Sequence, residues 1–420
     1  MTTKQLIKVP SAIVLILLGS AVGLVVGMFL GGSATAVSLA DTGPLLRWLT
    51  PTLRILMDVS QGIAIGGLVL IGFALTAKTQ AFRKSLNLVA ISSAIWALSG
   101  TAYLIVTYLN ISGSTFSLEQ SFADQFYIFV TSIELGKYLA LNLLAGFVLA
   151  IITLFIRNYL GVLFSGAIAL AALIPIALSG HSAGSSNHAL AVNSLGLHLL
   201  GISIWVGGLV TLIVAYRNDA RKEIVTRYSS LALFGFTLVL ISGFTAAQIR
   251  LGNISNWFTT SYGQVALLKV LALAVLGLFG FIYRTKLIKD LTDKFWKLVS
   301  FEFIVFGLAI GLGTALARTA YPVVDYPSGE LTPAEILTGS KLPTEPNAFS
   351  LFLSWKIDVL WSLICLAIVL FYILGVRRLR SRGDQWSLAR TLSWVSGVFL
   401  LFYITNGYFN VYEQYLFSSH

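Results

Sequence analysis

Long apolar runs, most of them about twenty residues in length, dominate this chain of 420 residues. A helix of about twenty residues crosses the roughly 30 Å hydrocarbon layer of a bilayer. The runs are continuous and do not alternate between apolar and polar residues, which excludes the strands of a membrane β-barrel. Charged residues make up 11% of the chain, against about 25% in soluble domains. The sequence therefore predicts an all-α, polytopic membrane protein with about eleven transmembrane helices.

The basic residues indicate how these helices are oriented. When the N-terminus is placed in the cytoplasm, 20 of the 28 lysines and arginines fall in cytoplasmic loops or at their edges. The positive-inside rule describes this excess, and it explains the net charge of +11 without nucleic acid as a partner. We predict a cytoplasmic N-terminus, an external C-terminus and spans at residues 11–32, 52–77, 86–108, 136–156, 160–180, 190–216, 229–249, 264–284, 297–318, 355–376 and 388–409.

The chain divides into three predicted segments. Residues 1–50 hold the first span and an outer loop. The apolar core of this span is longer than that of a signal peptide, so we expect it to be retained, although Ser38-Leu39-Ala40 resembles a cleavage site. Residues 51–320 form the main helical membrane domain. Residues 321–420 begin with an outer linker whose five prolines preclude a long helix, and they end with the last two spans.

Two loops are expected to contain short helices. The outer loop at 109–135 includes the aromatic stretch FADQFYIFV, which is typical of an amphipathic helix at the membrane interface. The inner loop at 217–228, RNDARKEIVTRY, mixes both charge signs and predicts a short surface helix.

Three of the four histidines fall within eighteen positions, namely His181, His188 and His198. His181 and His188 flank an outer loop, whereas His198 is expected ~12 Å inside the sixth span. An unpaired polar group in hydrocarbon costs several kcal/mol, so His198 either bonds a neighbouring helix or serves a function. Neutral imidazole binds copper, zinc and haem iron. We interpret the three histidines as candidate metal ligands, and the absence of a neighbouring cysteine argues against a closed structural zinc site.

Further residues complete a predicted pocket in the outer half of the bundle: Met57, Asp58, Gln61, Trp205 and Lys269. Asp58, Gln61, His198 and Lys269 are each too deep to be stranded in lipid, so we predict that they converge. The Met57 thioether is a soft ligand of the kind that Cu(I) prefers. A plainer interpretation pairs Asp58 with Arg54 at the interface and lets Lys269 extend toward water.

The sequence resembles the copper-resistance D (CopD) family over roughly residues 50–320. The resemblance is carried by SGHSAGSSNHALAVNSLGLHLLGISIWVGGL (179–209), by TSYGQVALLKVLALAVLGLFGFIYR (260–284) and by SFEFIVFGLAIGLGTALA, which begins at residue 300. TPAEILTGSKLP (332–343), VRRLRSRGDQW (376–386) and TNGYFNVYEQYLFSSH (405–420) resemble the beginning of a cytochrome c oxidase assembly (CtaG) domain. The pattern is similar to an actinobacterial-type fusion of the two, truncated after two spans of the second.

The resemblance implies a role in copper homeostasis at the bacterial plasma (inner) membrane, in which the protein transports or delivers copper. The residues that match the family's motif, and that would bind the metal, are His181, His188 and His198. The implied partners are the copper ion, a periplasmic or extracellular copper chaperone, and cytochrome c oxidase assembly factors. No motif of a soluble enzyme or of a copper-pumping ATPase is present. We therefore expect a protein that is not an enzyme and does not use ATP.

Two alternatives stay open. The WVGG pattern that follows His198 also resembles a membrane protoporphyrinogen oxidase family. That resemblance implies a haem-binding redox protein, with haem b as cofactor and His198 as an axial ligand. The other alternative is an oxidase-assembly scaffold without a site of its own.

The predicted orientation can be tested by cysteine labelling. In a Cys365→Ser background, a cysteine replacing Ser186 is expected to react with a membrane-impermeant maleimide from outside the cell, whereas one replacing Lys289 is expected to react only after the membrane is opened. Labelling of position 186 from the cytoplasmic side alone would contradict the predicted topology.

Overall fold

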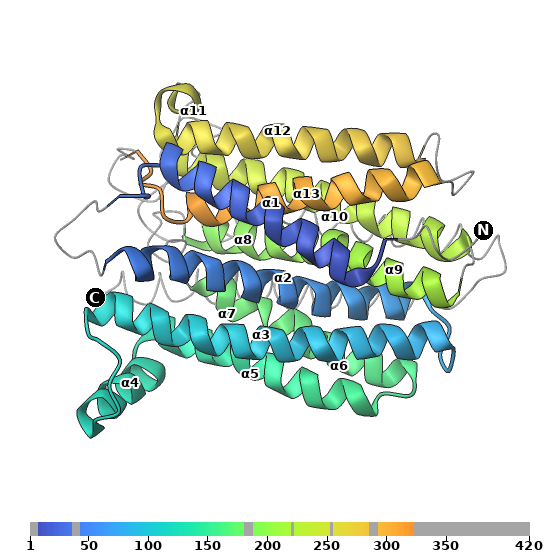
Figure 1. The fold of residues 1–420 in the computed structure, drawn as a ribbon, viewed down its shortest axis with the longest axis horizontal. Coiled ribbons are helices and arrows are strands. Elements are labelled where there is room, and N and C mark those ends of the chain that lie inside the picture. Colours follow the sequence, from blue (N-terminus) through green and yellow to red (C-terminus); the bar gives the residue numbers. More distant parts are fainter. Residues whose placement is uncertain are drawn as a thin grey trace, which may run out of the picture.

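The computed structural model describes residues 7–35, 43–179, 188–219, 222–252, 255–284 and 293–322. These residues form helices and no strand. Within them, nine helices or runs of consecutive helices are long and apolar enough to cross a membrane. The predicted all-α, multi-pass fold is therefore confirmed (Figure 1). The spans predicted at 355–376 and 388–409, the linker before them and His181 lie outside the described residues.

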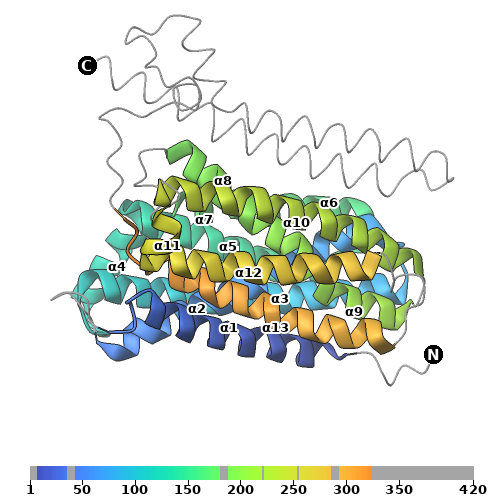
Figure 2. The same cartoon turned by 90° about the horizontal axis from the view of Figure 1, so that it is seen from above.

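The long helices run side by side along one axis of the molecule, as two perpendicular views show (Figures 1 and 2). We call the end that holds the 75–79 connection the inner end and the opposite end the outer end, following the predicted topology. The elements are α1 (Val9–Leu30), α2 (Pro44–Ala74), α3 (Gln80–Ser112), α4 (Gln120–Ser132), α5 (Glu134–Phe155), α6 (Tyr159–Ala171), α7 (Leu173–Leu178), α8 (His188–Ile202), the π-helix η1 (Ser203–Gly207), α9 (Gly208–Asn218), α10 (Lys222–Leu251), α11 (Asn256–Thr259), α12 (Ser261–Ile282) and α13 (Asp293–Leu316).

Tertiary packing moves several helix ends away from their predicted positions. The second span was expected to begin after Pro51, but α2 begins at Pro44, because Leu46 and Trp48 pack against the core and hold the helix on both sides of the proline. The predicted surface helix at 217–228 is wrong. Its first residues end α9, and residues 222–228 are the first two turns of α10. The helix expected in the 109–135 loop is present as α4, whose Phe122, Phe126 and Phe129 surround Tyr108.

The predicted fifth span is broken near its outer end. α6 ends at Ala171 and α7 starts at Leu173, just before Pro175, which has no backbone N–H to continue the helical hydrogen bonds. The amide of Asn142 on α5 donates to the Ala172 carbonyl (2.8 Å) and accepts from the Trp96 indole of α3 (2.9 Å). This buried amide therefore joins three segments of the bundle at the break.

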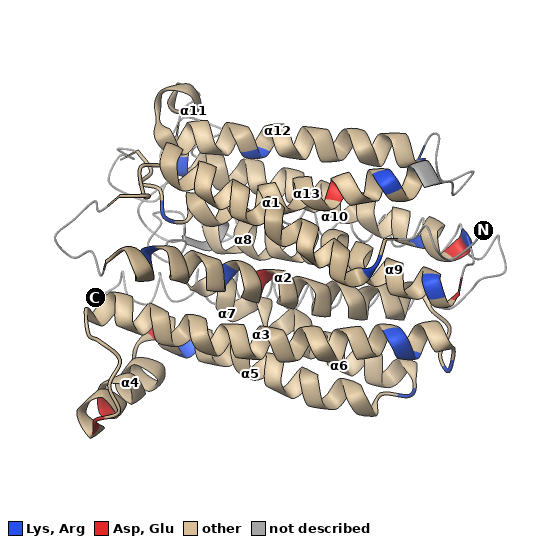
Figure 3. Ribbon diagram, viewed as in Figure 1, with Lys and Arg blue, Asp and Glu red and all other residues tan. Residues whose placement is uncertain are grey.

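The helices differ in how much of their surface the protein covers. Of the 18 residues in the most apolar stretch of α2, 83% are buried, compared with 28% in the corresponding stretches of α5 and α10 and 22% in that of α12. α2 is therefore the central helix, and α5, α10 and α12 present large apolar side chains such as Phe147, Phe244 and Phe281 to the surroundings, as lipid-facing helices do. Charged residues lie mostly toward the two ends of the bundle (Figure 3).

Glycine permits a close helix contact between α1 and α13. Gly19, Gly23 and Gly27 repeat every fourth residue on α1, and Gly307 and Gly311 do so on α13. A Cβ added to Gly23 would overlap the Leu308 carbonyl oxygen, and one added to Gly307 would overlap that of Ile16. Because lipid provides no hydrophobic drive for helices to associate, small residues that let backbones touch supply the packing energy.

A second backbone contact joins α2 to η1. A Cβ on Gly66 would overlap the Ser203 carbonyl oxygen, and a Cβ on Gly207 would overlap that of Gly62. The sixth span widens into a single π-turn at this crossing. The hydroxyl of Tyr228 on α10 donates to the Trp205 carbonyl (2.7 Å) and so satisfies a backbone group of that turn.

The α1–α13 contact can be tested by adding side-chain volume to it. Gly307→Leu is expected to destabilise the folded protein by at least about 1–3 kcal/mol, because the new side chain meets backbone rather than a movable side chain. Gly280→Leu is the matched control, since a Cβ at that position meets no atom within 4 Å. Thermal unfolding in detergent measures both, and an equal loss of stability in the two variants would contradict the packing described.

Candidate functional site

His198 lies within the bundle on α8. It is the eighth residue of the span that begins at Ala191, roughly 10 Å along the helix axis, and it is half-buried. Its Nδ1 is 3.2 Å from the hydroxyl of Ser242 on α10. That hydroxyl donates its own hydrogen to the Leu238 carbonyl, so the serine oxygen accepts from Nδ1–H. The proton of a neutral imidazole is thereby assigned to Nδ1, and Nε2 keeps its lone pair.

The surroundings of His198 leave its Nε2 open. No described side chain bonds this nitrogen, and the Val239 carbonyl of α10 is the other hydrogen-bond partner of the imidazole. Gly243 lies against the ring, where a Cβ would be 3.2 Å from Cε1 of the imidazole. The glycine therefore makes room for the ring between α8 and α10. A fixed tautomer with an open Nε2 is the state in which histidine binds a metal.

Lys269 of α12 is the charged group that interacts electrostatically with His198. Its ammonium group lies against α13, 3.0 Å from the position that a Cβ on Gly313 would take. Lys269 forms no ion pair with any described carboxylate, and Arg250 of α10 is a second cation near it. An uncompensated ammonium inside the bundle is costly in a membrane. The site therefore favours either a neutral amine or a bound anion beside the imidazole.

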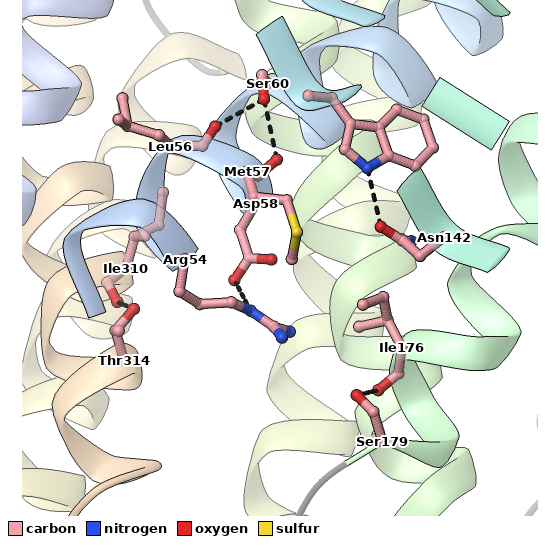
Figure 4. A network of polar contacts seen from close by, with 11 residues as sticks. Arg54, Leu56, Met57, Asp58, Ser60, Asn142, Ile176, Ser179, Ile310 and Thr314 are labelled. Atoms are coloured by element: carbon pink, nitrogen blue, oxygen red, sulfur yellow. Dashed lines mark hydrogen bonds and ion pairs between the residues drawn. The ribbon is translucent and has the colours of Figure 1, made fainter. Parts of the chain in front are cut away.

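A separate polar group lies on α2. Nε of Arg54 donates to the Asp58 carboxylate at 2.9 Å (Figure 4), and the guanidinium carbon is 5.5 Å from the ring centroid of Tyr103 on α3. The Met57 sulfur is buried against α3, 3.5 Å from where a Cβ on Gly100 would lie. Asp58 Oδ1 and the Gln61 Nε2 are buried without a hydrogen-bond partner. The self-neutralising Arg54–Asp58 pair is thus present.

The structure connects part of the predicted pocket. Lys269 lies within electrostatic range of His198, whereas Asp58 has its own partner in Arg54. α2 and α8 contact each other, and the convergence of Asp58 and Gln61 with His198 stays a prediction. Trp205 is two helical turns inward from His198, and it packs edge-on against Phe236 and Phe306.

The metal-binding role of the three histidines also stays a prediction. His188 begins α8, and His181 lies outside the described residues. Among the residues that the structure describes, no three His, Cys, Asp or Glu side chains come together as a metal site.

Three residues of this region were missed by the sequence analysis. Ser242 is one of many small residues in an apolar run, and only the packing of α10 against α8 brings it to His198. Asn193 of α8 is buried with both amide atoms unpartnered, and an amide inside an apolar span was a signal that could have found it. Glu302 of α13 is 3% exposed, with Oε2 unpartnered, and a carboxyl group inside an apolar span was the same kind of signal.

The tautomer of His198 is a direct prediction of this geometry. Nitrogen-15 NMR of the histidine-labelled protein in bilayers is expected to show a neutral ring protonated at Nδ1. Ser242→Ala should shift the Nδ1 resonance, whereas Thr245→Ala, one turn along α10 and bonded only to the Ile241 carbonyl, should leave it unchanged. A ring protonated at Nε2 would contradict the assignment.

Comparisons with known families match most of the described chain. The model of the copper resistance protein D-like N-terminal domain matches residues 45–189, and that of copper resistance protein D matches residues 222–316. The model of the cytochrome c oxidase caa3 assembly factor, Caa3_CtaG, matches residues 370–420. No solved structure matches the chain.

Curated relatives match over shorter stretches. The copper transport protein CutJ of Bacillus subtilis is 30% identical over 124 residues, which are 27% of this chain and 23% of CutJ. Uncharacterized proteins of Mycobacterium leprae and Mycobacterium bovis are 27% and 26% identical over 20% and 26% of this chain, and the matches cover 13% and 18% of their lengths. The matches therefore span less than a quarter of each relative. Together, these findings confirm the resemblance to the copper resistance protein D family, with a Caa3_CtaG segment at the C-terminus.

Proposed function

We propose that this protein transports copper, or delivers it, across the bacterial plasma membrane, with His198 as the ligand inside the bundle. The observation that carries the proposal is the geometry of that side chain. Its Nδ1 is fixed by Ser242, and its Nε2 is open, roughly 10 Å inside a span of a chain that matches a copper resistance family. The copper-related family supports the choice of ion.

The outer histidines provide a capture step in this proposal. His188 lies ten residues before His198 at the outer start of α8, and His181 lies seven residues earlier still. Copper that docks at these two residues is concentrated above the deeper ligand. A handover to oxidase assembly factors is the further role that the Caa3_CtaG match favours.

Lys269 distinguishes copper from the haem alternative. A charged ammonium beside His198 repels a copper ion, so removing it should leave copper binding unchanged or tighter. An ammonium attracts the anionic propionates of haem, so removing it should weaken haem binding. Besides the WVGG pattern, the electrostatic interaction of Lys269 with His198 is the observation that keeps the haem alternative open.

The histidine variants test the copper path. His198→Ala is expected to abolish the copper accumulation that the parent protein confers, because it removes the internal ligand without a backbone penalty in the helix. His188→Ala should reduce accumulation at low external copper and spare it at high copper. Cellular copper is measured at equal membrane levels of each variant, with His420→Ala as the matched control. Parental accumulation by His198→Ala would show that the path does not use this residue.

Metal analysis with an absorption spectrum separates the three functions. Stoichiometric copper without a Soret band, retained in Lys269→Met, is the expected result for the purified protein. A Soret band that Lys269→Met weakens would favour the haem-binding redox protein. A protein that takes up neither copper nor haem would leave the scaffold as the function.

A further inference from the structure

Glu302 is a buried carboxyl group that the proposed copper site does not use. It is the eighth residue of the span Phe295–Leu316, counted from the inner end, and therefore lies roughly 10 Å inside the bundle. Its side chain is 3% exposed. No described lysine, arginine or histidine forms an ion pair with it. An isolated carboxylate at this depth is expensive, so the carboxyl is expected to carry a proton.

The groups around Glu302 are aromatic and neutral. The indole of Trp205 and the hydroxyl of Tyr283 lie beside the carboxyl, and Tyr228 interacts with it from α10. Of the helices packed against α13, α1 contains no titratable residue, and the charged residues of α2 and α12, which are Arg47, Arg54, Asp58 and Lys269, lie in the outer halves of those helices. At the inner end, Arg217, Arg227 and Arg284 donate to backbone carbonyls and Lys297 is exposed. No described charge therefore compensates Glu302 or competes for its proton.

Two buried polar atoms of this cluster, Oε2 of Glu302 and the hydroxyl of Tyr283, lie near each other without the geometry of a full hydrogen bond. Tyr283 is buried, but it follows α12 directly and precedes the exposed Arg284 at the inner end. Tyr283 is therefore next in sequence to a residue at the inner surface. A proton that passes from the carboxyl to Tyr283 reaches the inner end of the bundle.

The cluster is also connected to His198. Trp205 lies seven residues inward from His198 on the same span and contacts both Phe306 and Glu302 of α13. The π-turn that holds Trp205 is clamped by the backbone contact with α2. His198, Trp205 and Glu302 therefore follow one another from the outer toward the inner half of the bundle.

We propose that Glu302 and Tyr283 form a proton-exchange site, and that its proton is the ion released inward when copper passes from His198. Release of the proton creates a carboxylate that attracts an incoming cation. The exchange of one monovalent cation for one proton leaves the buried charge unchanged. The proton site stands on Glu302 and its surroundings alone, whereas its coupling to copper rests on the proposed function.

Infrared spectroscopy of the full chain in lipid bilayers tests the proton site without copper. At neutral pH we expect the carbonyl band of a protonated carboxylic acid, which shifts in deuterated water. Glu302→Gln, nearly isosteric with the protonated acid, should abolish the band. Tyr283→Phe should shift it, because the group beside the carboxyl changes. Glu134→Gln, at an exposed position, is the matched control and should leave the band in place. A band that persists in Glu302→Gln would overturn the proposal.

Proteoliposomes loaded with a pH-sensitive dye test the coupling. Addition of Cu(I) should release protons on the side opposite to copper entry, and Glu302→Gln should lose both this signal and most of the copper flux. If Glu302→Gln moved copper and protons like the parent, the coupling would be overturned. If the infrared band were present but the parent moved no copper, the proposed function would fail and the proton site would stand.

Discussion

The contact between α2 and the π-turn η1 is the constraint on which the rest of the structure depends. Gly66 meets the Ser203 carbonyl and Gly207 meets the Gly62 carbonyl, with no room for a Cβ on Gly66 or on Gly207. The most buried helix of the bundle thereby fixes the sixth span at its middle. His198 on the outer side of this crossing and Trp205 within it take their positions from the same contact.

The main polar side chains inside the bundle have no water to bond, and they differ in the partners that the protein provides. The Asn142 amide donates to the Ala172 carbonyl at the break between α6 and α7, and Arg54 neutralises Asp58. His198 is satisfied at only one nitrogen, and Glu302 has an unpartnered oxygen. The Asn142 amide and the Arg54–Asp58 ion pair therefore stabilise the fold, whereas His198 and Glu302 are incomplete and have no ion-pair partner among the described residues. Incomplete groups in a membrane protein are where an ion or a proton is expected to bind.

Much of the fold could be predicted from the sequence, because length and hydropathy determine a membrane helix almost by themselves. The nine described spans agree with the prediction in number and order. Prediction failed at the 217–228 connection and at the start of α2, where packing and not hydropathy decides where a helix ends. The π-turn had no sequence signal, since it arises from a contact with a helix more than a hundred residues away.

The sequence was enough to predict His198 as the main residue of the candidate site, but not the residues that surround it. His198 and Lys269 stand out as ionisable groups in apolar runs, and the structure places them within electrostatic range of each other. Ser242 and Gly243 carry no such signal, because their role comes from the packing of α10 against α8. Glu302 also lies in an apolar run, but only the packing of α13 shows that its carboxyl group is buried with an unpartnered oxygen.

The central claim is that the open Nε2 of His198 binds copper inside the bundle. X-ray absorption spectroscopy at the copper edge of the loaded protein tests this claim most directly. The account predicts the scattering pattern of an imidazole ligand in the parent protein, and its loss or reduction in His198→Ala but not in His420→Ala. A spectrum that is the same in the parent and in His198→Ala would contradict the account.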